Sequence, residues 1–296
     1  MRSAIFALPL LASCNLVKLA ADQTADVLEV AAPANNMESD VQFAREAAPG
    51  QLKTVEGFLM ASPENRKMLA ILAQGYCEYA FGFLQDDVEA LVLAGKTDEA
   101  TPLVARTTAF YQRCTAYGLR LLGSDWDKAF HSSPAAFEKH VKSAEKSDVP
   151  GMFWTALGTA SAIDLNRDNI EMIADLPKAQ LLFERVLALD EAYYNGGAHL
   201  AMGMIQTSMS PALGGNPEAG KKHFERVVEL TFGKFLMPKV LLAASYGTIT
   251  QNQEFFHATL TQVLDTPPSV WPEQRLANEL AHIRAKRYLA HEKELF

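Results

Sequence analysis

From about residue 38 to the end of the chain, apolar residues recur at the spacing that places them on one face of an α-helix. Leu, Ala, Glu, Lys, Gln and Met dominate these segments, and runs of Val, Ile and Thr are scarce, which favours helix over strand. The pattern predicts an all-α protein with helices at 63–94, 98–122, 152–165, 177–189, 192–206, 217–230, 236–250, 254–264 and 272–289.

Local signals set the expected ends of several helices. Ser62 followed by Pro63 is typical of a cap and a first helical residue, and Asn216 followed by Pro217 repeats the arrangement. Gly95 interrupts the apolar pattern and predicts a tight turn between two long helices. These two helices should therefore form an antiparallel hairpin.

Two cysteines lie at matching places in that hairpin. Cys77 comes 18 residues before Gly95, and Cys114 comes 18 residues after Lys96, so an antiparallel pair places both thiols at the same height. An oxidising compartment would allow a disulfide between them. Equal height does not make both side chains face inward, and unpaired cysteines are commonly buried as small apolar residues. Both interpretations stay open.

A repeated helix appears in the C-terminal half. Ala179 with Phe183 reappears, 41 residues later, as Gly220 with Phe224, and Glu-Arg-Val follows each Phe. A small residue four positions before an aromatic one is typical of the second helix of a tetratricopeptide (TPR) repeat. We expect TPR-like antiparallel helix pairs stacked as a compact helical solenoid over residues 38–296, in two lobes joined by a connector near 124–150.

The N-terminus resembles a bacterial lipoprotein signal. Residues 4–11 are apolar, and Leu11-Ala12-Ser13 precede Cys14 as in a lipobox, where Cys14 is acylated and becomes the mature N-terminus. We expect a signal peptide at 1–13 and a lipid-attached tether at 14–37, because residues 22–36 are small and polar with little periodicity. Asn15 is not Asp, so the residue that retains enteric lipoproteins in the inner membrane is absent. The resemblance therefore favours a periplasmic protein anchored in the outer membrane. The alternative is a short helix that holds an ordinary buried cysteine.

The composition disfavours several kinds of function. A net charge of −8 and a pI of about 5.4 disfavour nucleic acid as a partner. The histidines and cysteines show no spacing typical of a metal site, and Gly215 to Lys222 fails as a phosphate loop because Lys222 replaces the Ser or Thr that binds magnesium. We therefore expect no enzyme, no cofactor and no metal.

Several motifs resemble one known family, the T component of tripartite ATP-independent periplasmic (TRAP) transporters, which are TPR-like periplasmic lipoproteins. The similar segments cover about residues 40–290, and they include Phe153-Trp154, Ala174 to Pro177, Tyr193 to Leu200, Ser210 to Glu225 and Gly233 to Leu236. The resemblance implies a trimer with a lined cleft or pore that docks a periplasmic solute-binding subunit and helps to transfer a small apolar solute.

Candidate cleft or interface residues follow from these motifs: Phe153, Trp154, Tyr193, Tyr194, Pro211, Gly214 and Gly215. The aromatic residues are also consistent with an ordinary core, and the proline and glycines with a simple turn. The alternative function is a TPR-like envelope scaffold that binds proteins and no small molecule. A deep apolar cavity with Trp and Tyr in its wall would favour the transport accessory, and a shallow polar groove would favour the scaffold.

Overall fold

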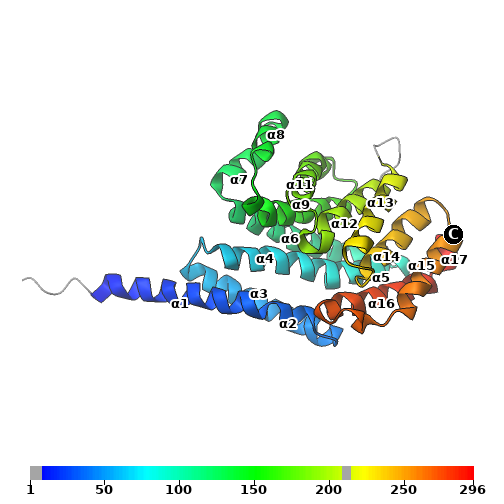
Figure 1. Cartoon of the computed structure of the whole chain (residues 1–296), viewed down its shortest axis with the longest axis horizontal. Coiled ribbons are helices and arrows are strands. Elements are labelled where there is room, and N and C mark those ends of the chain that lie inside the picture. The colour runs from blue at the N-terminus through cyan, green and yellow to red at the C-terminus, as the bar shows by residue number, and fades with distance from the viewer. Residues whose placement is uncertain (1–8, 209–214) are drawn as a thin grey trace, which may run out of the picture.

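The computed structural model describes residues 9–208 and 215–296, and these ranges contain helices and no strand. The expected all-α class is therefore confirmed, and the main helices lie where the apolar pattern placed them (Figure 1). The first half contains α1 (Pro9–Ala31), α2 (Pro33–Asn36), α3 (Val41–Ala61), α4 (Arg66–Tyr79), the π-helical η1 (Ala80–Leu84), α5 (Gln85–Leu93), α6 (Thr97–Leu122), α7 (Ser124–Phe130), α8 (Pro134–Lys142) and η2 (Lys146–Asp148). The second half contains α9 (Val149–Asp164), α10 (Ile170–Ile173), α11 (Leu176–Leu189), α12 (Tyr193–Ser208), α13 (Pro217–Leu230), α14 (Met237–Leu242), the π-helical η4 (Ala243–Gly247), α15 (Gln253–Asp265), η5 (Pro268–Val270), η6 (Pro272–Gln274), α16 (Arg275–Ala290) and α17 (Glu292–Leu295).

The start of α13 is as expected, whereas the start of α4 is not. The side chain of Asn216 accepts a hydrogen bond from the backbone of Ala219, which caps α13. Helix α4 begins at Arg66 and is capped by Asn65, so the expected cap at Ser62 is wrong by three residues. The Ser62 hydroxyl donates instead to Asp22 of α1, at 2.6 Å. A tertiary contact thus takes the side chain that the local pattern assigned to capping.

Neighbouring helices pack in sequence along most of the chain. The hairpin of α4, η1 and α5 with α6 is followed by α9, α11, α12, α13 and α14, each packed against the one before it. Helices α6 and α9 approach closely at Gly158, where an added Cβ would lie 2.6 Å from the carbonyl oxygen of Tyr111. Helices α6 and α9 therefore lie directly against each other, with α7, α8 and η2 in the stretch between them, and the expected division into two lobes joined by a connector near 124–150 stays a prediction.

The repeated Gly and Phe residues explain the packing of α13. The ring of Phe224 lies against Gly203 of α12, where an added Cβ would be 3.0 Å from the ring. Gly220 faces Gly203 and Thr207 of the same helix, with 2.9 Å between its ideal Cβ position and the Gly203 carbonyl oxygen. Phe224 and Phe183 are both fully buried. The small residue thus brings two helix backbones together, as the repeat pattern predicted.

The stack of helices closes on itself. Helix α16, near the C-terminus, packs against α2 and α3 near the N-terminus, and in Figure 1 these segments lie side by side. A buried ion cluster joins α16 to α5: Nε of Arg284 donates to Oδ1 of Asp86 at 3.0 Å, and Arg287 donates to the same carboxylate. Arg284 also donates to the carbonyl oxygen of Phe81 at 2.6 Å. The first and last parts of the chain are therefore fastened together.

The N-terminal segment differs from the expected irregular tether. Residues 22–31 belong to α1, and Ala21 and Ala25 are buried against the body of the protein. Asp22 accepts hydrogen bonds from Ser62 and Asn65, and Lys67 forms ion pairs with two acids of α1. One narrow face of alanines and acids is sufficient to attach the helix, although it gives little apolar periodicity. Within the described ranges, no helix has the length and apolar character needed to cross a membrane.

Candidate functional site

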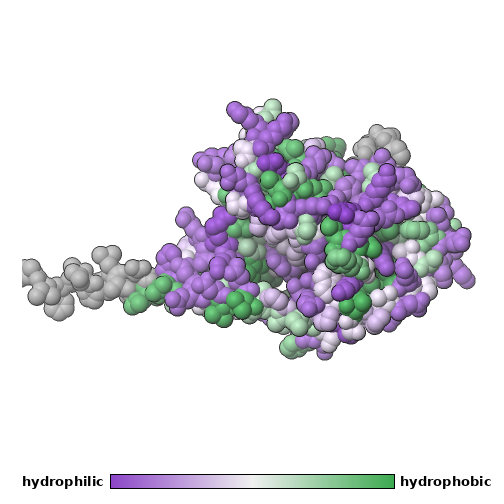
Figure 2. Space-filling view, in the orientation of Figure 1, coloured by the Kyte–Doolittle hydropathy of each residue, from purple (hydrophilic) through white to green (hydrophobic). Residues whose placement is uncertain are grey.

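The closed stack surrounds a cavity of about 750 Å³. Its wall comes from helices far apart in the sequence, mainly α3, α4, η1, α9, α12, α14 and α16, so that both ends of the chain are needed to build it. Most of the lining side chains are aliphatic or aromatic. Hydrophilic residues cover most of the face shown in Figure 2, and hydrophobic residues gather in its central hollow and along the protruding α1.

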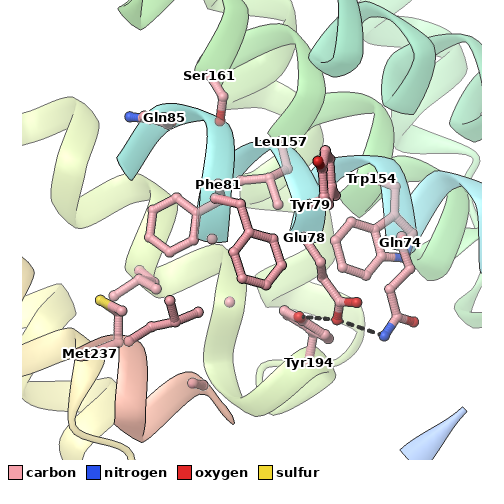
Figure 3. A pocket seen from close by; sticks show the side chains of 18 of the residues that line it. Gln74, Glu78, Tyr79, Phe81, Gln85, Trp154, Leu157, Ser161, Tyr194 and Met237 are labelled. Atoms are coloured by element: carbon pink, nitrogen blue, oxygen red, sulfur yellow. Dashed lines mark hydrogen bonds between the residues drawn. The ribbon is translucent and has the colours of Figure 1, made fainter. Parts of the chain in front are cut away.

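The π-helical segment η1 supplies aromatic side chains to the cavity. It interrupts the long helix of α4 and α5, and Phe83 lines the cavity from this segment, as does Phe81. Figure 3 labels Phe81. Single π-helical turns inside α-helices are rare and occur frequently at functional sites. An added Cβ on Gly82 would lie 3.2 Å from the side chain of Leu280, so α16 presses closely on this segment.

A left-handed turn at the start of α12 presents Tyr194 to the cavity. Tyr194, Asn195 and Gly196 have φ values of 49°, 58° and 78° in succession. Left-handed backbone costs about 1 kcal/mol or more for a bulky residue such as Tyr, and such strain concentrates at functional sites. Gly197 follows, and an added Cβ there would lie 2.7 Å from the ring of Phe153. The Tyr-Tyr-Asn-Gly-Gly sequence therefore serves to bring Tyr194 against the aromatic residues of α9.

The four aromatic residues proposed from the sequence form one cluster. The ring of Phe153 lies 5.4 Å from that of Tyr193 and 5.5 Å from that of Tyr194, and the ring of Trp154 lies 4.7 Å from that of Tyr194. Phe153, Trp154 and Tyr194 line the cavity, whereas Tyr193 supports Phe153 from behind and is not part of the wall. Phe153 and Trp154 are at the same time almost fully buried, so they belong to both the core and the wall.

One acidic side chain lies among these aromatic residues. Oε1 of Glu78 accepts a hydrogen bond from the Tyr194 hydroxyl at 2.6 Å and a second from the Gln74 amide at 2.8 Å (Figure 3). Burial raises the pKa of the Glu78 carboxyl, and the two hydrogen bonds offset only part of this effect. Burial and the charge of Glu78 likewise raise the pKa of Tyr194, which stays a neutral donor.

Exposed lining residues show where the cavity meets solvent. Phe43 and Gln51 of α3 are exposed, as are Arg167, which precedes α10, and Ile173 at the end of α10. The side chain of Phe43 is 61% exposed, which is unusual for a phenylalanine on a helix that otherwise packs into the body. The cavity is therefore open to solvent at these places.

The remaining residues singled out from the sequence lie elsewhere. Cys77 and Cys114 are joined by a disulfide across the hairpin, with 5.4 Å between their Cα atoms, and Cys77 also lines the cavity. Gly215 is buried just before α13 and does not line the cavity. Pro211 and Gly214 lie outside the described residues. Cys14 is within α1, and its acylation stays a prediction.

A cluster of polar side chains joins α12 to α13 away from the cavity. Nδ1 of His199 lies 2.7 Å from Nδ1 of His223, and Nε2 of His199 lies 2.9 Å from Glu191, which also accepts two hydrogen bonds from Arg226. Burial, and then the nearby His199, lower the pKa of His223. In the part of the chain that the structure describes, no group of three or more His, Cys, Asp or Glu side chains could hold a metal ion.

The described residues define an all-α protein whose helices close around an apolar, aromatic-walled cavity, and not an open polar groove. Residues 37–296 match the family described as the TRAP transporter T-component, and the chain belongs to this family. No curated protein matches the sequence. Membership gives the protein an accessory role in a TRAP transport system, and it confirms the resemblance inferred from the motifs.

The sequence indicates the aromatic residues of this site but not its acidic residue. Glu78 and Gln74 lie four residues apart, one helical turn, but a single Glu on a long amphipathic helix reads as a solvent-facing residue. Phe81 and Phe83 were also missed, because no pattern along the helix separates an aromatic residue that lines a cavity from one that packs in the core. The one available signal was the density of aromatic residues from Tyr76 to Phe83 around a Glu.

Proposed function

We propose that the cavity holds a small, mainly apolar solute and that the protein docks a TRAP solute-binding subunit to exchange it. The cavity itself carries the proposal: about 750 Å³ lies within the range of roughly 300–1,000 Å³ typical of small-molecule sites, and its wall is predominantly apolar and aromatic. A scaffold that binds only proteins has no use for an internal volume of this kind. The strained Tyr194 backbone also supports a binding role over a purely structural one.

Docking at the exposed lining residues would connect the two proteins. A solute-binding subunit that covers Phe43 and Ile173 would bury apolar side chains now in water and would face an entrance to the cavity. Such transient interfaces bury roughly 1,200–2,000 Å² in total, with apolar residues near the centre. The surface around Phe43 and Ile173 thus combines access to the cavity with exposed apolar side chains, and both properties favour it as the docking surface.

The proposed location is the periplasm, with acylated Cys14 in the outer membrane. Helix α1 extends past the stack at its N-terminal end in Figure 1, which would separate a lipid at Cys14 from the cavity-bearing body. Family resemblance also suggests a homotrimer. Exposed aliphatic side chains along α1, including Leu16, Val27 and Val30, support contact with another copy. Light scattering on detergent-solubilised protein should then give three times the mass of the mature chain that begins at Cys14.

Co-elution with the solute-binding subunit encoded beside this gene tests the docking proposal. The Cys14→Ser chain, which lacks the lipid site, should form a complex with that subunit, and Phe43→Glu should weaken it by about tenfold or more. Phe232→Glu is a matched control, because Phe232 is 87% exposed and lies outside the cavity lining. Absence of any complex would contradict docking, and equal binding by both variants would place the docking surface elsewhere.

A further inference from the structure

The charged residues of the cavity wall are few, and only two of them form an ion pair with each other. Among the lining residues that the structure describes, the charged ones are Glu38, Glu78, Asp164 and Arg167. Arg167 is bound to Asp164. Oε1 of Glu38 accepts hydrogen bonds from the backbone of the two residues that follow it, at 2.7 and 2.8 Å. Glu78 is the remaining acid, and no basic side chain in this wall is paired with it.

The hydrogen bonds around Glu78 leave acceptor atoms available. Both bonds end on Oε1, so Oε2 receives none from the described residues. A carboxylate has about four lone-pair sites, and the Tyr194 oxygen and the Gln74 amide oxygen are further acceptors. The Tyr194 hydroxyl proton is already directed at Glu78. The part of the cavity wall formed by Glu78, Gln74 and Tyr194 is therefore rich in hydrogen-bond acceptors and poor in free hydrogen-bond donors.

Aromatic rings surround the same point. Trp154 and Tyr194 meet edge to face at 4.7 Å, and Figure 3 shows the Trp154 side chain beside Glu78. Aromatic faces attract cations through the ring quadrupole, most strongly when water is excluded. An unpaired carboxyl next to Trp and Tyr combines the two kinds of group that recognise organic ammonium ions.

We propose that the cavity selects an amphiphilic amine, whose apolar body contacts the aliphatic wall and whose ammonium group binds Glu78 between Trp154 and Tyr194. This inference rests on the proposed solute-binding function and specifies the class of solute. An alkyl ammonium group has three N–H donors, which match the acceptors of Glu78, Gln74 and Tyr194. A carboxylate of the same length would meet an acid and no available cation, and an alcohol would gain no charge-assisted hydrogen bond.

The protonation of Glu78 should also distinguish the binding of an amine from the binding of an alcohol. Because burial raises the pKa of the Glu78 carboxyl, the empty cavity favours its protonated form more than water does. A bound ammonium ion favours the ionised carboxylate. At a pH near the pKa of the Glu78 carboxyl in the empty protein, amine binding should therefore release protons from Glu78, and an alcohol of the same length should release none.

Calorimetric titration with decylamine, decanol and decanoate tests the proposal. The Cys14→Ser chain should bind decylamine about tenfold to a hundredfold more tightly than decanol, the ratio expected for one charge-assisted hydrogen bond. Titrations in buffers of different ionisation enthalpy, run at a pH near the pKa of the Glu78 carboxyl in the empty protein, should show proton release with decylamine alone. Glu78→Gln should bring the ratio to about threefold or less and abolish proton release. Glu38→Gln, a second lining acid, should change neither.

The outcomes separate this inference from the proposed function. If decanol binds the cavity and decylamine binds no more tightly, the amine preference is refuted while the apolar site stands. The same holds if Glu78→Gln keeps the preference. If none of the three compounds binds, the solute-binding function itself is contradicted.

Discussion

Replacing Arg284 with Met should weaken the closure of the helical stack around the cavity. The guanidinium of Arg284 is 2% exposed; it donates to Asp86 and to the Phe81 carbonyl oxygen, and it lies 4.3 Å from the centre of the Phe81 ring. Methionine occupies a similar volume but has no donor. The variant therefore leaves a buried backbone oxygen without its partner and leaves Asp86 with only Arg287.

The expected loss of stability follows from the burial of this cluster. Burial alone would raise the pKa of Asp86, but the hydrogen bond from Arg287 and the charge of Arg284 lower it overall, so the carboxylate is ionised at neutral pH. Removing one partner of a buried ion pair costs about 3–5 kcal/mol. With an unfolding entropy of about 0.6 kcal/mol/K for a chain of 296 residues, Tm should fall by about 5–8 °C.

Arg275→Met is the matched control, because Arg275 lies on the same helix and pairs with Glu279 one turn away near the surface. Pairs of this kind contribute about 0.3–0.5 kcal/mol, so its Tm should change by about 1 °C or less. Differential scanning calorimetry and urea unfolding measure both variants. A Tm for Arg284→Met within 2 °C of the wild type would refute the role of this cluster in closing the stack.

The remaining predictions concern the cysteines and the histidine pair. Native periplasmic protein should contain the Cys77–Cys114 disulfide and should therefore have an intact mass two hydrogens below that of the reduced form. Closing a 37-residue separation stabilises the fold by about 3.8 kcal/mol in the chain-entropy model. Complete alkylation of both thiols in the native protein would contradict the disulfide. Labelled palmitate should enter the wild type and not Cys14→Ser, and equal labelling would exclude a lipid anchor there. Because the folded pKa of His223 lies below its ordinary 6.5, its contribution to stability is fully present above pH 6.5 and is lost as pH falls through the folded pKa. Tm should thus fall more between about pH 7.5 and 5 in the wild type than in His223→Asn. An equal fall of Tm in the two proteins would contradict this role of the His199–His223 pair.

Local signals were sufficient to predict most of the helices. The apolar period and the turn at Gly95 gave the α4–α6 hairpin, and Asn216 with Pro217 gave the start of α13, since each depends on residues within one or two turns. The equal heights of Cys77 and Cys114 also follow from chain distance alone. These features need no knowledge of the distant parts of the fold.

Features that depend on contacts between distant segments were not predicted. The hydrogen bonds of Asp22 to Ser62 and Asn65 attach α1 to the body and take Ser62 from its expected capping role. Arg284 and Asp86, which close the stack, are separated by 198 residues and look like surface charges in the sequence. A pattern within one helix does not indicate which distant residue such a charge contacts.

The residues of the candidate site likewise fall into some that the sequence predicted and some that it did not. Phe153, Trp154 and Tyr194 were found because their motifs resemble the T-component family, although the resemblance did not separate wall from core. Glu78 was missed because its surroundings come from α4, α9 and α12 together, and its shifted pKa arises from burial by those helices. The left-handed backbone of Tyr194 is likewise a consequence of packing against Phe153 and not a preference of tyrosine.

Photoaffinity labelling tests most directly the central claim that the cavity is a solute site. A decanol that carries a diazirine on its alkyl chain should label residues of η1, α9 and α12 that line the cavity, such as Phe81, Leu157 and Leu200, as mapped by mass spectrometry of the digested protein. Excess unlabelled decanol should suppress this labelling. Labelling confined to exposed aliphatic residues of α1, such as Val30, or labelling of the cavity that decanol does not suppress, would contradict the claim.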